Sequence, residues 1–158
     1  MTFKLVTWLK YSLLLIMMSS LTACIIFPLK KSDPDPGLWW CPPLPNCAST
    51  EAVTFVHSIQ PFELIMPIDQ AWPIIHKTVL SLQGASIEHE YQGYIYAKTY
   101  TRVFHFLDYF EVLYMSDENR LNVRSSSLLG ITDFLANYFR TEEFREKLEL
   151  EGVIKKKG

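Results

Sequence analysis

The sequence is poor in the residues that several common classes of protein require. It contains six glycines, none of them clustered, so no glycine-rich loop is available to cradle a phosphate. Its four histidines stand at no spacing typical of metal ligands. Its formal charge is only −2, from 15 basic and 17 acidic residues, which argues against a strongly basic nucleic-acid-binding face. We therefore expect no metal, no cofactor and no nucleic-acid partner.

Apolar residues, in contrast, are plentiful. Hydrophobic residues make up 49% of the chain and aromatic residues 14%, and this composition excludes a wholly disordered protein. A chain of 158 residues is long enough to bury one hydrophobic core. No internal repeat or low-complexity stretch appears. A single domain is therefore expected.

The first 23 residues show the features of an exported lipoprotein in the expected order. Lys4 and Lys10 supply a positive start before a short apolar run over 11–18, and the tetrapeptide 21–24, Leu-Thr-Ala-Cys, follows. This tetrapeptide resembles the bacterial lipobox, in which cleavage falls just before a cysteine that is diacylated. The resemblance implies that residues 1–23 are a signal peptide and that Cys24 is the lipidated amino terminus.

The position after the acylated cysteine bears on where such a protein is kept. In lipoproteins of Gram-negative bacteria, an aspartate there often marks retention in the inner membrane, and this chain has Ile25. We expect a membrane-anchored lipoprotein of the bacterial envelope, in the outer membrane and facing the periplasm. The alternative is an uncleaved transmembrane anchor over 11–27, which only just reaches the ~17–25 residues that a spanning helix needs.

Residues 24–40 have the composition of a lipidated cysteine followed by a flexible tether. Pro28, Pro34 and Pro36 disfavour regular structure there, and charged residues between them keep the segment solvated. The two remaining cysteines, Cys41 and Cys47, enclose three prolines, which lower the entropy lost on closing a loop. Because export places thiols in an oxidising compartment, we expect a disulfide between them. Two thiols are too few for a metal site.

The rest of the chain predicts an α+β fold. We expect a twisted antiparallel sheet with two helices packed on it, in the order β-α-β-β-β-β-α, and a domain over 41–150 followed by a frayed tail over 151–158. The expected strands cover 53–59, 85–91, 94–101, 104–115 and 121–128. The first helix begins at Asp69 or Pro73 and is stopped by Gly84. The second has Thr132 as its N-cap and Asp133 in its first turn, and it breaks near 141–143.

One hairpin can be given a register from its sequence. The polar residues 116–119 turn the chain, and a loop of two or four residues pairs positions whose numbers sum to 235. Glu111 then faces Arg124, which is a favourable cross-strand contact and avoids an uncompensated buried charge. Further pairs are Tyr109 with Ser126 and Leu113 with Asn122, while Phe110, Val112 and Tyr114 point to the opposite, core-facing side.

Separated motifs then follow one another along the chain. They are Cys41-Pro-Pro-Leu-Pro-Asn-Cys47 with Ser49, His57-x-Ile59-x-Pro61, Tyr94-Ile95-Tyr96-Ala97, Arg102-x-Phe104-x-Phe106-x-Asp108-x-x-Glu111, Val123-Arg124-Ser125-Ser126-Ser127, and Gly130, Asp133, Asn137 and Arg140. With these motifs, the stretch from Cys41 to about Leu148 resembles the domain of unknown function 1499 family of bacterial and plastid proteins. That family commonly has charged residues where this chain has Tyr109, Leu128 and Tyr138. The resemblance implies a fold and no mechanism.

A set of polar residues is the candidate site. Its members are His57, Arg102, Asp108, Glu111, Arg124, Ser125, Ser127, Asp133, Asn137 and Arg140. Asp108 lies on the expected core face opposite Ser127, where an unpaired carboxylate is costly, so it needs Arg102, Arg140 or a ligand. The set is interpreted either as a functional site or as a structural network that docks the last helix through Asp133 and Asn137.

Two functions remain open at this point. The first is a periplasm-facing binding or envelope-maintenance module that holds an envelope protein or an apolar ligand. Its weak support is the number of aromatic residues, among them Phe104, Phe106, Tyr109, Phe110 and Tyr114. The alternative is a hydrolase-like enzyme that uses Asp108 and Glu111. A cleft containing both carboxylates would favour the enzyme.

Overall fold

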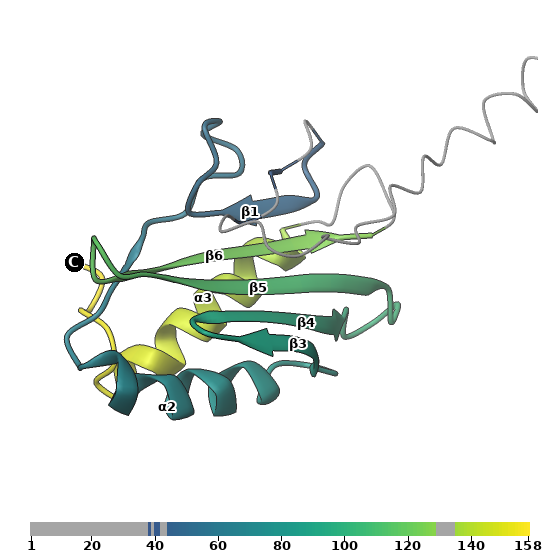
Figure 1. Ribbon diagram of the computed structural model, residues 1–158. Coiled ribbons are helices and arrows are strands. Elements are labelled where there is room, and N and C mark those ends of the chain that lie inside the picture. Colours follow the sequence, from purple (N-terminus) through teal and green to yellow (C-terminus); the bar gives the residue numbers. More distant parts are fainter. Residues whose placement is uncertain (1–37, 39, 42–43, 129–134) are drawn as a thin grey trace, which may run out of the picture.

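The computed structural model describes residues 38, 40–41, 44–128 and 135–158. The expected signal peptide, Cys24, most of the tether, Gly130, Thr132 and Asp133 lie outside the described residues. The described chain forms one open antiparallel sheet and two helices (Figure 1). The predicted α+β class is therefore confirmed.

The sheet has the strand order β1-β6-β5-β4-β3, and β2 pairs with β6 beside β1. The strands are β1 (Cys47–Ser49), β2 (Phe62–Glu63), β3 (Ser86–Tyr91), β4 (Tyr94–Tyr100), β5 (Leu107–Met115) and β6 (Arg120–Ser127). The helices are α2 (Ile68–Leu80) and α3 (Ala136–Leu150). Both helices contribute to one hydrophobic core with one face of the sheet. We call this side the helix face and the other the open face.

The predicted register of the β5–β6 hairpin is confirmed. Glu111 pairs with Arg124 and Tyr109 with Ser126, and every pair in the ladder sums to 235. Phe110 and Val112 are fully buried among core residues of α2, α3, β4 and β6. The prediction succeeds because side chains alternate between faces along a strand, so one apolar set fixes the pairing of the whole hairpin.

The predicted strand over 53–59 is wrong. Residues 50–58 form turns, and their only ladder contact among the described residues is a bridge between Ser49 and Ser58. The short strand β1 precedes them and pairs with β6 in the sheet. Val53 and Phe55 are β-prone residues that point into solvent. β-propensity reports how well a side chain fits a half-buried sheet surface, and this segment has no such surface.

The two helices differ from expectation mainly at their ends. α2 begins at Ile68, directly after Pro67, and continues through Pro73, its sixth residue, which has no N–H to donate to the carbonyl of Asp69. α3 begins at Ala136 and runs without the break predicted near 141–143. Thr141 instead turns its hydroxyl back to the carbonyls of Asn137 and Tyr138 within the same helix. The polar run that suggested a break is thus part of the helix.

The prediction that 151–158 is a frayed tail is also wrong. Val153 and Ile154 are buried in the core, and Ile154 forms a bridge with Leu64. The amide of Ile65 donates to the carbonyl of Val153 at 3.0 Å, and the amide of Lys155 donates to that of Glu63 at 2.9 Å. The residues after α3 therefore return to the sheet and close the core beside β2. None of the helices described, α2 and α3, is long and apolar enough to cross a membrane.

Candidate functional site

The candidate polar residues divide between the two faces of the β5–β6 hairpin. Asp108, Ser125 and Ser127 lie on the helix face, and Glu111 and Arg124 lie on the open face, as the alternation of strand side chains requires. We call the first group, together with Asn137 and Arg140 of α3, the helix-face cluster. The open-face cluster consists of Tyr94, Glu111, Asn122, Arg124 and Ser126.

The helix-face cluster is a closed hydrogen-bond network around a buried ion pair. Arg140 donates from Nη2 to Oδ2 of Asp108 at 2.5 Å, so Arg140 is the partner that the carboxylate needed. Its Nη1 donates to Oγ of Ser125 at 2.9 Å and to Oδ1 of Asn137 at 2.8 Å. The hydroxyl of Ser125 donates to the same Oδ1 at 2.6 Å.

Asn137 extends this network to a third part of the chain. Its Nδ2 donates to the carbonyl of Asn46 at 2.8 Å and to Oγ of Ser127 at 3.0 Å. The amide of Ser127 donates to the same Asn46 carbonyl at 2.9 Å. The helix-face cluster therefore fixes α3, β6 and the segment before β1 to one another. The structural interpretation accounts for its contacts.

The open-face cluster is built around a second buried ion pair. Arg124 donates from Nη1 to Oε2 of Glu111 at 2.7 Å, and their side chains are 1% and 0% exposed. The hydroxyl of Tyr94 donates to the other carboxylate oxygen at 2.6 Å. Burial, followed by the Glu111 charge and this hydrogen bond, raises the pKa of Tyr94 well above its usual range. Glu111 thus accepts bonds at both oxygens.

Three side-chain atoms of this cluster have no hydrogen-bond partner among the described residues. They are Nε of Arg124, Oδ1 of Asn122 and Oγ of Ser126, and they occupy alternate positions of β6 on the open face. The other end of Asn122 is engaged, because its Nδ2 donates to Oε1 of Glu51 at 2.6 Å. The set therefore offers one donor, one acceptor and one hydroxyl in a row.

Aromatic rings cover the neighbouring strands of the open face. Tyr96 stacks on Tyr109 with ring centres 5.3 Å apart and on His89 at 6.0 Å, and Tyr91 lies 5.0 Å from Tyr94. Burial, and next the neighbouring Tyr109, raise the pKa of Tyr96 above its usual range. These rings, four of them from tyrosines, lie on β3, β4 and β5 beside the row on β6.

Other predicted site residues lie elsewhere. His57 is buried and contacts the carbonyl of Cys47 through Nδ1 at 2.9 Å, so it stabilises the segment beside β1. Arg102 is exposed in the connection between β4 and β5. The predicted disulfide between Cys41 and Cys47 is confirmed. Asp133 lies outside the described residues.

Sequence reasoning missed several buried polar residues. Arg145 is buried on α3, where its guanidinium lies 3.8 Å above the ring of Phe62 and donates to the carbonyls of Gln60 and Pro61. Its spacing from Asn137 and Thr141 places it on the buried side of the helix, which was the available signal. Asn46, Tyr94, Asn122 and Ser126 also belong to the two clusters, and the pairing register could have placed the last two.

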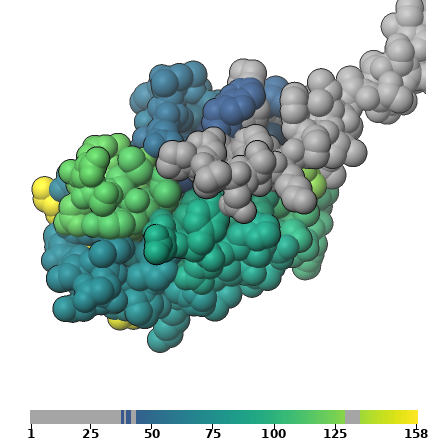
Figure 2. Space-filling model, in the orientation of Figure 1, coloured from purple at the N-terminus to yellow at the C-terminus, as the bar shows by residue number. Residues whose placement is uncertain are grey.

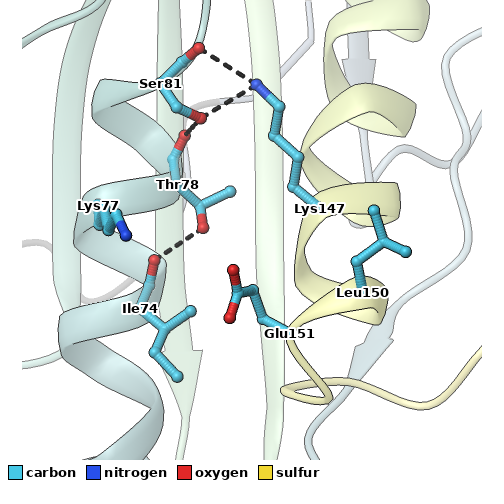
Figure 3. Close-up of a pocket in the computed structure, with 7 residues that line it drawn as sticks. All are labelled: Ile74, Lys77, Thr78, Ser81, Lys147, Leu150 and Glu151. Atoms are coloured by element: carbon cyan, nitrogen blue, oxygen red, sulfur yellow. Dashed lines mark hydrogen bonds between the residues drawn. The ribbon is translucent and has the colours of Figure 1, made fainter.

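A hollow of about 260 Å³ lies between the two helices, away from both clusters (Figure 3). It is lined by Ile74, Lys77, Thr78, Ser81, Lys147, Leu150 and Glu151. Lys147 donates to the hydroxyl and carbonyl of Ser81, at 3.0 and 3.2 Å, and to Glu143 at 2.8 Å. The hydroxyls of Thr78 and Ser81 donate to backbone carbonyls of α2. Only the bonds from Lys147 to Ser81 join the end of α2 to α3, and the others stay within one helix or its cap.

The described members of the candidate site take part in hydrogen bonds, ion pairs and ring stacking. Among the described residues, no three histidine, cysteine, aspartate or glutamate side chains are grouped as a metal site would require. Asp108 and Glu111 lie on opposite faces of β5, so their carboxylates do not share a cleft.

Comparison with known proteins identifies the family. Residues 38–148 match the model of a family described as protein of unknown function (DUF1499). The match covers more than half of the chain and contains both clusters, so the chain belongs to this family. No curated protein and no solved structure matches it.

Proposed function

We propose that this member of the DUF1499 family is a lipid-anchored protein of the bacterial envelope whose domain binds a partner in the periplasm. The order of charge, apolar run and lipobox-like tetrapeptide before Cys24 supports the anchor. The disulfide between Cys41 and Cys47 supports an oxidising compartment, because such bonds are rare in reducing ones. Two or more acyl chains would hold the protein stably on a membrane.

The row of unpartnered polar atoms on β6 is the observation that supports a binding role. A buried polar atom without a partner costs about 1–3 kcal/mol, and Asn122, Arg124 and Ser126 each present one on the open face. A bound molecule would recover this cost where its hydrogen-bonding groups reach these atoms, which are buried in the unbound protein. The stacked tyrosines beside the row would add apolar contact area. The open face thus has the few fixed polar groups and the aromatic surface that binding sites use.

The paired charges indicate the kind of partner. Glu111 and Arg124 neutralise each other, so the site does not select a strongly charged ligand. Its free atoms include both a donor and acceptors, which suits a neutral ligand rich in polar groups or the polar surface of an envelope protein. A purely apolar ligand would leave all three atoms unpartnered. Among the partners considered from the sequence, an envelope protein therefore fits better than an apolar ligand.

The hydrolase alternative has less support. A pair of carboxylates performs acid–base chemistry when both reach one substrate, and Asp108 and Glu111 point to opposite sides of the sheet. Each is also bonded to an arginine. Ser125 donates to Asn137 and not to a histidine, so it lacks the base that would activate a nucleophile.

Metabolic labelling with a palmitate analogue tests the anchor. We expect label on the wild-type chain and none on Cys24→Ser, which serves as the control because the rest of the chain is unchanged. An unlabelled wild-type chain would refute the lipid anchor.

Photo-crosslinking in intact envelopes tests the binding face. A crosslinking residue in place of Tyr109 lies beside Ser126 on the open face, and one in place of Lys77 lies on the exposed side of α2. We expect a discrete product at position 109 and none at 77, and we expect Ser126→Ala to weaken the product at 109. Equal products at both positions, or none at 109, would contradict the proposed face.

A further inference from the structure

Two segments beside β1 present large apolar side chains to solvent. In the turns that follow β1, Val53 is 100%, Phe55 96% and Val56 68% exposed. In the segment that precedes β1, Trp40 is 65% and Leu44 40% exposed. We call these five side chains the apolar edge. Scattered surface apolar residues are normal, but five within 17 residues of chain, on both sides of one strand, are concentrated.

The segments that carry the apolar edge are held in place. The Cys41–Cys47 disulfide ties the segment that precedes β1 to β1 itself. The ring of His57 contacts the Cys47 carbonyl at 2.9 Å, and the amide of Ser49 donates to the carbonyl of His57 at 2.8 Å. Within the turns that follow β1, the amides of His57 and Ser58 both donate to the carbonyl of Thr54 at 3.1 Å. The fold therefore presents these side chains to solvent on fastened turns.

Both segments stand on the same border of the sheet. Figure 1 shows them in blue beyond β1, on the side away from β6. In the space-filling view of Figure 2, their atoms project from the top of the molecule. On the helix face α3 reaches this border through the bond from Asn137 to Asn46, but in Figure 1 neither helix lies beyond β1. The apolar edge is thus a projecting rim, separate from the open-face cluster.

The position of the tether brings this rim closest to the membrane, if Cys24 is acylated as proposed above. Sixteen residues, 25–40, separate Cys24 from Cys41, and a chain of this length spans at most about 3.3–3.6 Å per residue. The tether ends at Cys41, which the disulfide fixes to β1. A rim joined to its target through a short linker meets it at high effective concentration.

The composition of the rim fits a lipid surface. Residues 44–58 contain no lysine or arginine, and their one acidic side chain, Glu51, accepts a hydrogen bond from Asn122. Nothing in this segment would attract an acidic protein or nucleic acid. Tryptophan and phenylalanine are well suited to the boundary between lipid headgroups and acyl chains.

We propose that the apolar edge inserts into the surface of the bilayer that holds the anchor, with Phe55 and Val53 entering deepest. The inference rests on the proposed lipid anchor and adds the orientation of the domain. With the β1 border on the membrane, the strands β6, β5 and β4 lie at increasing distance from the membrane, in that order. The open face then stands roughly perpendicular to the membrane.

The experiment places a polarity-sensitive dye on a single added cysteine of the full, lipidated chain. Phe55→Cys provides the test position and Leu150→Cys the control, because both side chains are exposed and Leu150 lies at the end of α3. The native cysteines do not react, since Cys41 and Cys47 are joined and Cys24 carries lipid. The protein is reconstituted in vesicles of phosphatidylethanolamine and phosphatidylglycerol, with and without brominated acyl chains. Palmitate labelling of the same preparation verifies the anchor.

We expect the dye at position 55 to shift to shorter wavelength and to be quenched by brominated lipid at least threefold more than the dye at 150. Val53→Ser with Val56→Ser should reduce that quenching. Equal quenching at 55 and 150 in a labelled protein would overturn the insertion and leave the anchor intact. An unlabelled protein would overturn the anchor and this inference with it. A dye at 55 that is shielded in envelopes but not in vesicles would assign the rim to a protein partner instead.

Discussion

At the scale of single residues, the chain uses two arginines to neutralise two buried carboxylates, one on each face of the same hairpin. Arg124 lies in the strand next to Glu111, whereas Arg140 reaches Asp108 from a helix. A buried ion pair adds little net stability compared with an apolar pair, because both charges lose their hydration. Replacing only one residue of the pair is costly, because the charge of the other residue then stays buried without a partner.

The Glu111–Arg124 pair should therefore respond non-additively to mutation. We expect Glu111→Gln and Arg124→Met each to lower the free energy of unfolding by about 3–5 kcal/mol. The double variant should lose clearly less than the sum, because it leaves no unpaired charge. Urea unfolding at neutral pH measures all three.

The surface pair Glu118–Arg120 provides the matched control, since it is at 2.8 Å but partly exposed. Glu118→Gln and Arg120→Met should each cost about 1 kcal/mol or less. Additive losses for the buried pair would contradict the contact between Glu111 and Arg124.

Tyr94 should make the protein sensitive to alkali. Because burial raises the pKa of the folded Tyr94, the unfolded chain releases this proton near pH 10 while the folded chain retains it. The contribution of this group is therefore constant below pH 10, and stability falls as the pH rises further. Tyr94→Phe should lower stability at neutral pH, through the lost hydrogen bond to Glu111, but should lessen the decline above pH 10.

Melting temperatures between pH 8 and pH 11.5 test this expectation. Tyr138→Phe, at an exposed position of α3, is the control and should follow the wild-type curve. If Tyr94→Phe and the wild type decline in parallel above pH 10, the buried phenol is not responsible for the alkaline loss.

At the scale of elements, α3 shows why part of the fold resists prediction. Its buried side carries Asn137, Arg140, Thr141 and Arg145 as well as Phe144 and Leu148. Polar residues weaken the apolar periodicity by which helices are recognised, so a break was expected where none exists. Asn137 and Arg140 are buried because the sheet supplies their partners, and that information is tertiary.

The segment after α3 should be essential for stability. Val153 and Ile154 are completely or almost completely buried, and burying an aliphatic side chain is worth about 1.5–3 kcal/mol. A chain that ends at Gly152 should therefore lose several kcal/mol, whereas one that ends at Lys155 should lose about 1 kcal/mol or less, since it lacks only exposed residues. Chemical denaturation of both truncated chains decides the point, and similar losses would show that the tail is dispensable.

At the scale of the whole molecule, the sequence predicts structure best where apolar and polar residues alternate along a strand or where two residues can only pair with each other. The β5–β6 register, the Glu111–Arg124 contact, the disulfide and the fold class were predictable, because each follows from local pattern or composition. The division of the candidate site into two faces was implicit in the spacing of Asp108 and Glu111. The turns at 50–58 and the docked tail were not predictable, since short apolar groups there carry no signal about what they contact.

The disulfide should stabilise one border of the molecule and leave its centre unchanged. Cys41 and Cys47 are six residues apart, and closing so short a loop is worth about 2 kcal/mol. In the double variant Cys41→Ser, Cys47→Ser, we expect faster hydrogen exchange at Ser49, Ile59 and their neighbours beside β1. Amides at the centre of β5 and β6 should keep their protection. Loss of protection throughout β4 and β5 would show that the bond supports the whole sheet.

The contacts that α3 makes with early parts of the chain also determine when folding can finish. Asn137 bonds to Asn46 across 91 positions of chain, and Arg145 reaches Gln60 across 85. A polypeptide leaves a ribosome or a translocation channel amino end first, so Asp108 emerges well before the arginine that neutralises it. The helix face of the β-sheet therefore lacks its contacts with α3 until residues 136–150 have emerged. We expect such a chain to stay flexible during its passage and to become rigid only after α3 has emerged.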